Sequence, residues 1–157
     1  MEETAWGATD ADIERIVELA ARFRSDLAGE RGGELWQAAD VEPVDAGRVL
    51  AWLADPAVFV VVGGIDGAAL GFAVARAVGL RDGTRLGVID ELFVEREARE
   101  VGVGEAIVDA VSRWCRAEGC RGIDATALPG MRASKNFFEG SGFVTRRLTM
   151  HHRLTDE

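Results

Sequence analysis

The spacing of hydrophobic residues changes once along this chain, and that change limits the possible folds more than any other feature. Residues 58–62, 68–78 and 86–94 are rich in strand-forming side chains and are separated by glycine-bearing turns. From residue 102 to residue 118 the apolar residues recur at helical spacing, and Gly119 then stops the helix. The residue pattern at positions 122–127 predicts another strand. A strand, a helix and a strand in succession predict a parallel pair beside an antiparallel meander.

The flanking segments add further helices and strands. Helices are predicted over residues 10–27, 45–54 and 131–139, and strands near residues 5–8 and over residues 143–152. Residues 28–43 show no period and are predicted to be irregular. No repeat or linker divides the chain, so residues 1–157 are expected to form one domain. The predicted fold class is α/β (α+β), with a mixed, mostly antiparallel sheet and helices on both faces.

Charge and cysteine content exclude several kinds of partner. The chain has 18 basic and 27 acidic side chains, so its formal net charge is −9. This charge disfavours nucleic acids and anionic membranes and suits an amine-bearing partner. No apolar run reaches the roughly 18 residues of a membrane span, and the N-terminal residues lack the features of a signal peptide. Cys115 and Cys120 lack zinc-ligand spacing, so we expect two reduced thiols, no metal site and a cytoplasmic protein.

The segment from Ile89 to Gly104 carries the clearest chemical signal. A predicted strand ends at Val94, and the pattern R-x-x-G-x-G at Arg99–Gly104 then begins a helix. The first amides of a helix have no partner within it and lie at the positive end of its dipole, so such a turn can bind phosphate. The bare pattern is equally compatible with a helix start that binds nothing. It is neither a Walker loop nor a dinucleotide motif.

Two motifs together resemble the GNAT superfamily of N-acetyltransferases. The first is R-x-x-G-x-G after a strand ending in L-F-V, and the second is N-F-F-E-G-S-G-F at Asn136–Phe143, similar to the family element A-x-x-F-Y-E-x-x-G-F. The resemblance implies a splayed parallel strand pair that binds acetyl-CoA between its strands. Acetyl-CoA would be the acyl donor, and no metal ion would be needed. It also implies contacts with coenzyme A by Leu92, Phe93, Val94, Arg99, Glu100, Val101, Gly102, Val103, Gly104, Glu105, Met131, Ser134 and Lys135.

The resemblance further implies transfer of an acetyl group to a primary amine of a small molecule or a peptide. Family members commonly carry the general base on the strand that ends in L-F-V, where the Leu92 amide would polarise the thioester carbonyl. Strict alternation places residues 88, 90, 92 and 94 on one face and residues 89, 91 and 93 on the other. Asp90 is therefore the first candidate for the base, through a water molecule, and Glu91 is the second. The structural alternative for Asp90 is an ion pair with Arg85 or another cation.

Two departures from the family pattern bear on activity. Glu100 stands where glycine is common, and its carboxylate would repel phosphate unless it turned to solvent. Phe138 stands where a tyrosine often protonates the leaving thiolate, and the chain contains no tyrosine. Water, Ser134 or Ser141 could replace that tyrosine as the acid. Release of the sulfur as an unprotonated thiolate, at a pH about one unit below the pKa of the thiol, costs only about 1.4 kcal/mol. The sequence is also compatible with a non-catalytic acyl-CoA-binding module, with an enzyme that transfers larger acyl groups, and with a homodimer. It does not identify the acceptor.

Overall fold

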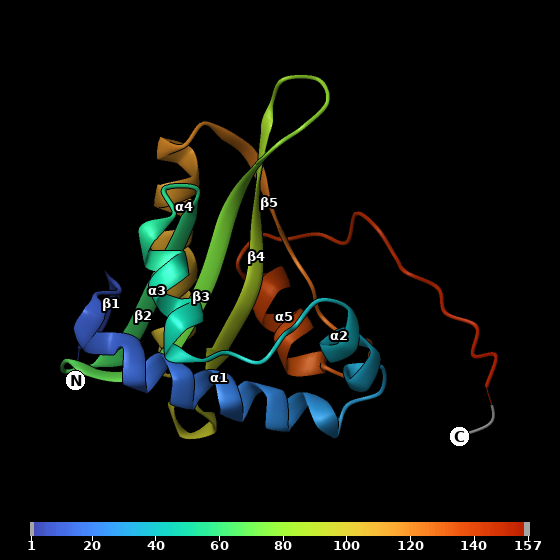
Figure 1. The fold of residues 1–157 in the computed structure, drawn as a ribbon, viewed down its shortest axis with the longest axis horizontal. Helices are drawn as coiled ribbons and strands as arrows, with labels where there is room; N and C mark the ends of the chain where they lie inside the picture. The colour runs from blue at the N-terminus through green and yellow to red at the C-terminus, as the bar shows by residue number, and fades with distance from the viewer. Residues whose placement is uncertain (1, 156–157) are drawn as a thin grey trace.

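The computed structural model describes residues 2–155 and shows a sheet with helices packed on both of its faces (Figure 1). Most of the predicted elements form close to their predicted positions. In chain order the elements are β1 (Glu3–Gly7), η1 (Asp10–Asp12), α1 (Ile13–Ala28), α2 (Gly33–Ala39), α3 (Ala46–Ala54), β2 (Val58–Ile65), β3 (Ala68–Gly79), β4 (Arg85–Val94), η2 (Arg96–Ala98), α4 (Val103–Ala117), β5 (Cys120–Ala125) and α5 (Arg132–Gly140).

The strands lie across the sheet in chain order, β1-β2-β3-β4-β5. The first four strands pair antiparallel, and β5 joins β4 in parallel after the α4 crossover. The antiparallel meander and the parallel pair that the change in spacing predicts are therefore both present. Three consecutive valines in β2 suit a strand that is covered on both faces.

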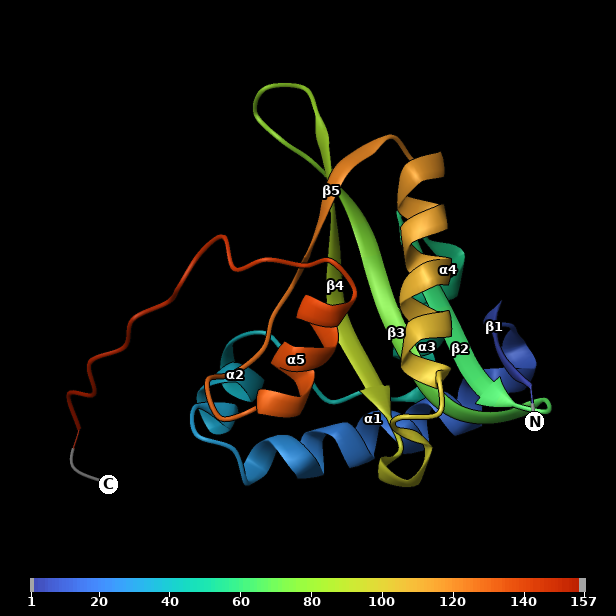
Figure 2. The same ribbon diagram turned by 180° about the vertical axis from the view of Figure 1, so that it is seen from behind.

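Two apolar cores lie on opposite faces of this sheet. On what we call the α1 face, α1, α2 and α3 close a core that includes Ile16 and Phe72. On the α4 face, α4 packs over a core that includes Val61 and Ile107 (Figure 2). The approach of α4 is close, because a Cβ atom on Gly63 of β2 would come within 2.5 Å of Cγ1 of Ile107. Glycine in the middle of this strand is thus a packing requirement.

A β-bulge at Asp90 changes which side chains of β4 share a face. The register between β3 and β4 passes from Ile89 to Glu91 and gives Asp90 no partner residue. Ile89 packs on the α4 face, as does Leu92, whereas Phe93 packs on the α1 face. Glu91 also lies on the α1 face, where it bonds to α1. The prediction from strict alternation is therefore wrong across residue 90, because the extra residue reverses the order of the faces.

The parallel pair opens at one end. β4 and β5 pair from Arg85 and Cys120 to Ile89 and Ala125, where β5 ends, with one shift of register between Arg85 and Gly87. β4 continues to Val94, so among the described residues no strand lies beside its last five residues on the β5 side. This is the splayed arrangement expected for the fold. The chain then forms α5, which lies near this open end (Figures 1 and 2).

Two segments differ from the sequence-based expectation. Residues 28–43, predicted to be irregular, contain α2, whose Trp36 meets Phe23 of α1 edge-on with ring centroids 6.1 Å apart. Residues 143–152, predicted to form the last strand, pair with no strand among the described residues and lead away from the domain (Figures 1 and 2). We call residues 143–155 the C-terminal tail. Alternation alone did not make it a strand, because a strand also needs a neighbour.

Candidate functional site

The open edge of β4 leads directly to the first turn of α4. Only η2 and a few loop residues separate Val94, the end of β4, from Val103, the start of α4. Within residues 2–155, the backbone of residues 90–94 has no strand partner on the β5 side, and the first N–H groups of α4 lack partners within the helix. An extended ligand with amides in one part and phosphates in another would match these two features.

The turn before α4 includes two residues in the left-handed region. Gly102, the N-cap of α4, has a φ of +91°, and Glu100 has a φ of +74°. The carbonyl of Gly102 accepts the first helical bond, from the Ala106 N–H at 3.0 Å. Glycine adopts this conformation freely, whereas a residue with a side chain pays roughly 1–2 kcal/mol. Glu100 therefore combines backbone strain with a carboxylate close to the positive end of a helix.

Gly104 has a packing role that the motif did not indicate. A Cβ atom on Gly104 would lie 2.9 Å from Cε1 of Phe137 in α5, closer than real Cβ contacts. The ring of Phe137 also meets the ring of Phe138, with centroids 5.4 Å apart. Gly104 thus allows α5 to pack on the first turn of α4. A loss of ligand binding in a Gly104 variant would not by itself identify a ligand contact.

Arg99 connects the turn to β4 and to α1. Its Nε donates to the carbonyl oxygen of Val94 at 2.8 Å, and its Nη2 lies 3.5 Å from Oδ2 of Asp26. The guanidinium also lies over the ring of Phe93, 5.6 Å from the centroid. The contact with Asp26 is long for a hydrogen bond, so that end of the guanidinium is available to a better anion.

The two candidate bases on β4 have different surroundings. Asp90 is partly exposed, and its Oδ2 accepts from Nε of Arg76 at 2.6 Å. Glu91 is only 6% exposed, and its two oxygens accept from Arg24 at 2.6 and 3.0 Å. Asp90 thus forms an ion pair, with Arg76 rather than Arg85, and Glu91 is the more buried carboxylate of the two.

Arg24 of α1 is an important residue that sequence patterns did not single out. Besides Glu91, it donates to the backbone carbonyls of Ala20, at 3.1 Å, and Glu42, at 3.0 Å. It therefore joins β4 to α1 and to the segment before α3. A signal was present in the sequence, because Arg24 directly follows the buried Phe23 on the inner side of an amphipathic helix. A charged residue in that position requires a partner.

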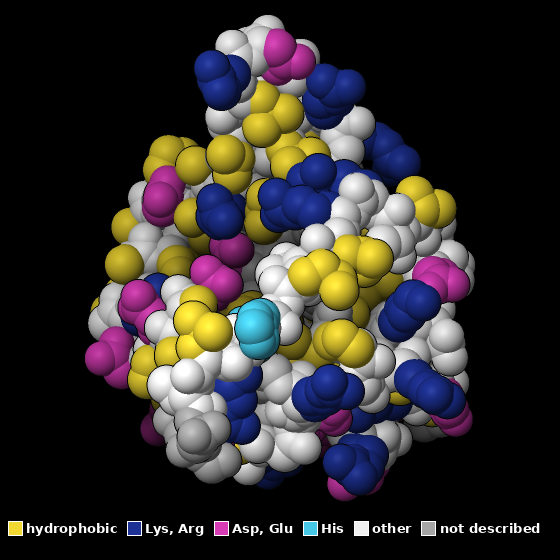
Figure 3. All heavy atoms as spheres, turned by 90° about the vertical axis from the view of Figure 1, so that its right-hand side faces the viewer, with side chains coloured by type: hydrophobic (Ala, Val, Ile, Leu, Met, Phe, Trp, Pro, Cys, Tyr) yellow, Lys and Arg dark blue, Asp and Glu magenta, His cyan; other side chains and the backbone are white. Residues whose placement is uncertain are grey.

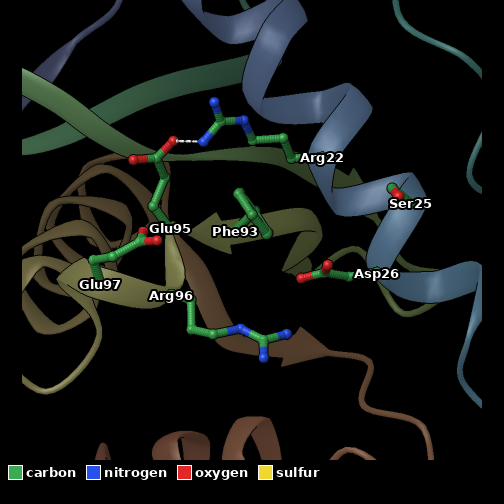
Figure 4. Close-up of a pocket in the computed structure, with 7 residues that line it drawn as sticks. All are labelled: Arg22, Ser25, Asp26, Phe93, Glu95, Arg96 and Glu97. Atoms are coloured by element: carbon green, nitrogen blue, oxygen red, sulfur yellow. Dashed lines mark hydrogen bonds and ion pairs between the residues drawn. The ribbon is translucent and has the colours of Figure 1, made fainter.

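A cleft of about 180 Å³ lies between α1 and the loop that follows β4 (Figure 4). Arg22 reaches across it from α1 and pairs with Glu95, and Phe93 lies between the two sides. The cleft has a mixed lining of three carboxylates, two guanidinium groups, an aromatic ring and a hydroxyl, from Arg22, Ser25, Asp26, Phe93, Glu95, Arg96 and Glu97. It is thus a polar recess next to the open end of β4.

The predicted contacts on α5 lie at the start of that helix. Met131 is its N-cap, packs against the core of the α1 face and accepts a hydrogen bond from the Lys135 N–H at 3.0 Å. The Lys135 ammonium lies 3.5 Å from Glu139, and both side chains are exposed. Ser134 is half-buried in the first turn. Lys135 is therefore an exposed cation at the start of α5, the helix that lies near the open edge.

Phe138 lies in an apolar environment close to the open end of β4. It packs against the core of the α4 face, as Leu92 does. Its ring meets those of Phe137 and Phe143 with centroids 5.4 and 5.2 Å away. The structure thus brings Phe138 and Leu92 to the same core, where the phenylalanine ring offers no proton donor.

Another carboxylate that sequence reasoning missed lies on β5. Asp124, opposite Val88 in the parallel register, accepts two hydrogen bonds from Arg146 of the tail, one of them from Nε at 2.8 Å. The hydrogen-bonded guanidinium holds the pKa of Asp124 below its usual value. Asp124 therefore stays charged near neutral pH.

Comparison with known families decides the class of this fold. A profile described as "Acetyltransferase (GNAT) family" matches residues 14–143. The chain belongs to the GNAT family of acetyltransferases. The matched range contains both motifs, the open edge of β4 and the first turn of α4. Comparison with curated proteins found no match to the chain.

Several solved structures share this fold over nearly the whole chain. A mutant of the BH1408 protein from Bacillus halodurans is 20% identical, with a TM-score of 0.83 over 96% of this chain and 99% of that chain. AAC(6')-Iy, in complex with the bisubstrate analogue CoA-S-monomethyl-acetylneamine, is 20% identical, with a TM-score of 0.73 over 99% and 100%. An aminoglycoside acetyltransferase, meta-AAC0020 from an uncultured soil metagenomic sample, is 13% identical, with a TM-score of 0.73 over 99% and 97%. At these identities the likeness establishes the GNAT fold.

Residues 2–155 contain neither a cluster of metal-ligating side chains nor a helix that could span a membrane. The histidine, cysteine, aspartate and glutamate side chains of this range form no group of three or more that could hold a metal ion. In the same range, no helix is both long and apolar enough to cross a bilayer.

Proposed function

We propose that this chain is an acetyl-CoA-dependent N-acetyltransferase that acetylates a primary amine of a small molecule or a peptide. The observation that carries the proposal is the continuity between the open edge of β4 and the first turn of α4. Membership of the GNAT family supports the reaction class. The complex of AAC(6')-Iy with an analogue that contains CoA is consistent with the choice of donor. Acetyl-CoA would supply the acetyl group as an activated thioester.

The residues around the open edge fit coenzyme A well in shape and partly in charge. The edge of Leu92 to Val94 that faces away from β3 can bond to the amides of the pantetheine arm, although the Val94 carbonyl already accepts from Arg99, and the amides of residues 101–105 can receive the pyrophosphate. Arg99 and Lys135 supply cations on two sides. Glu100 and Glu105 oppose them, so we expect the carboxylates of this turn to weaken binding.

Proton removal from the amine is assigned to Asp90, acting through a water molecule. Transfer to an amine needs a base, and the thioester oxygen needs a hydrogen-bond donor, for which the Leu92 N–H on the open edge is suited. Among the described contacts, the ion pair of Asp90 engages Oδ2 and leaves Oδ1 for water. Both oxygens of Glu91 bind Arg24, so Glu91 is the second candidate and serves first as a positioning residue.

The cleft beside Phe93 suits an acceptor that carries positive charge. Asp26, Glu95 and Glu97 line it, and the net charge of −9 attracts cations to the whole molecule. Arg22 and Arg96 also line the cleft, so polar substituents on the amine would find donors there. These features favour a polar amine over an apolar one.

Release of free thiol from acetyl-CoA in the presence of a panel of primary amines tests the proposal, together with calorimetric titration of coenzyme A. Asp90→Asn should lower turnover by about 10²-fold or more and leave coenzyme affinity unchanged, since it removes only the base. Asp82→Asn is the matched control, because Asp82 is exposed in the loop between β3 and β4. Full activity of Asp90→Asn would transfer the role to Glu91 or to solvent, and absence of coenzyme binding would refute the whole proposal.

A non-catalytic acyl-CoA-binding module is the second candidate function. Two observations favour it: Phe138 offers no acid for the leaving thiolate, and Glu91 is fully engaged by Arg24. Tight binding of coenzyme A with no thiol release for any amine would select this function over the first.

A further inference from the structure

Cys115 and Cys120 are neighbours in space because of the way α4 ends. Gly119, directly after the C-cap of the helix, has a φ of +75°, and its N–H donates to the carbonyl oxygen of Arg116 at 3.1 Å. Both features belong to the Schellman motif, in which the third residue before the C-cap and the second residue after it come into contact. In this chain those two positions are Cys115 and Cys120. The spacing of the cysteines, which suits no zinc site, therefore suits a facing pair of thiols.

Packing against β4 holds the Cys115 sulfur beside Cys120. A Cβ atom on Gly87 of β4 would lie 2.6 Å from Sγ of Cys115, so the sulfur fills the space above this glycine. Cys120, the first residue of β5, pairs with Arg85 of the same β4 segment. Both cysteines are free thiols; Cys115 is buried and Cys120 is partly exposed. Burial and then the neighbouring Cys120 thiol raise the pKa of Cys115 to about 12, so Cys120 is the thiol that reacts first.

A small molecule can reach this pair of thiols from the surface. Cys115 and Cys120 line a cavity of about 180 Å³ where α4 leads into β5, and Arg116 and Arg121 line it as well. The face of the molecule on the β5 side of the sheet carries many basic side chains among apolar ones (Figure 3). A small disulfide that carries carboxylate groups can therefore approach Cys120 although the net charge of the chain is −9.

We propose that Cys115 and Cys120 are a redox site, which a small-molecule disulfide such as glutathione disulfide converts to an intramolecular disulfide. The Cys120 thiolate attacks one sulfur of glutathione disulfide, whose S–S bond breaks and releases the first glutathione. The Cys115 sulfur then attacks the Cys120 sulfur of the mixed disulfide, and the second glutathione leaves with the Cys115 proton. Two protein thiols are thus oxidised while two glutathione thiols form. This site is independent of the proposed acetyl transfer.

Equilibration of the full chain in mixtures of reduced and oxidised glutathione tests this proposal. Mass spectrometry should show a protein lighter by two hydrogen atoms, and peptide mapping should show Cys115 linked to Cys120. The equilibrium constant for this disulfide should be at least about tenfold larger in the folded protein than in concentrated urea. The reason is that the fold already holds the two sulfurs together, whereas the unfolded chain must close the loop.

Single variants test the order of the two steps. Cys115→Ala should accumulate the mixed disulfide of Cys120 with glutathione, and Cys120→Ala should stay unmodified because its remaining thiol is buried. A wild-type protein that stays reduced, or that stops at the mixed disulfide, would overturn the proposal. An equilibrium constant in the folded protein no larger than the constant in urea would overturn it as well, because the fold would then strain the bond.

Discussion

Replacing Glu100 separates backbone strain from charge at the turn before α4. With a φ of +74°, Glu100 holds a conformation that costs roughly 1–2 kcal/mol for a residue with a side chain. Glycine removes that cost but adds about 0.5–1 kcal/mol of unfolded-state entropy. The expected net gain of Glu100→Gly is therefore about 0.5–1 kcal/mol in the free energy of unfolding. In a domain of this size, that gain corresponds to a rise of roughly 1–4 °C in Tm.

The variant Glu100→Gln is the control, because it removes the carboxylate and keeps the strain. Without ligand it should be slightly less stable than wild type, by a few tenths of a kcal/mol, because a carboxylate near a helix N-terminus is favourable. For coenzyme A the sign reverses: at about 10 Å in water each phosphate charge is repelled by about 0.4 kcal/mol and the two charges of the pyrophosphate together by about 0.8 kcal/mol, so both variants should bind roughly fourfold more tightly.

Calorimetric unfolding without ligand and titration with coenzyme A measure the two effects. If the Tm of Glu100→Gly does not exceed that of Glu100→Gln, the strain argument is wrong. Equal coenzyme affinity in all three proteins would show that the carboxylate does not face the phosphates.

Three further predictions concern the leaving group, the buried ion pair and the thiols. Phe138→Tyr should raise turnover a few-fold when the rate of thiol release is measured from about pH 6.5 to 9. The gain should be largest at low pH, because protonation of the leaving sulfur matters most where the thiolate is least stable. Thiol release that does not increase at any pH would mean that another group supplies the proton. Arg24→Ala should lower the free energy of unfolding, measured in urea, by about 3–5 kcal/mol, because it leaves the Glu91 carboxylate buried and unpaired. The double variant Arg24→Leu/Glu91→Leu should recover most of that loss. Equal losses in the two variants would contradict the pairing. Burial raises the pKa of Cys115 to about 12, so iodoacetamide at about pH 8.5 should label Cys120 alone, as peptide mass spectrometry would show. Because the folded pKa of Cys115 lies above the ordinary value of 9.0, its contribution to stability is present below about pH 9 and is lost as pH rises toward 12, and Cys115→Ala should flatten that decline.

The parts of the fold that the sequence predicts well are those set by local spacing. The valine-rich β2 has strong strand propensity and the amphipathic α4 has a helical period, so the meander and the crossover could be placed without knowledge of their neighbours. Their order then placed the open edge of β4 next to the first turn of α4. That geometry underlies the candidate site, and it follows from the chain order of the elements.

The features that escaped prediction depend on contacts between distant residues. The bulge at Asp90 belongs to the pairing of β4 with β3, and alternation within β4 contains no trace of it. The partners of the two β4 carboxylates are Arg76 and Arg24, which lie 14 and 67 residues away in the chain. The tail shows the converse, because its local pattern is that of a strand and only a neighbouring strand could complete it.

The bulge determines which side chains of β4 lie on the same face of the sheet. Upstream of Asp90 the odd-numbered residues face α4, and downstream of it they face α1. Removing Asp90 would make Ile89 and Glu91 adjacent, and simple alternation would then keep Ile89 and Leu92 toward α4 and Glu91 toward Arg24. The deletion would thus remove one carboxylate from the site and leave the other side chains of β4 on their present faces. A bulge residue is therefore a position at which such a strand can gain or lose a functional side chain without turning its neighbours.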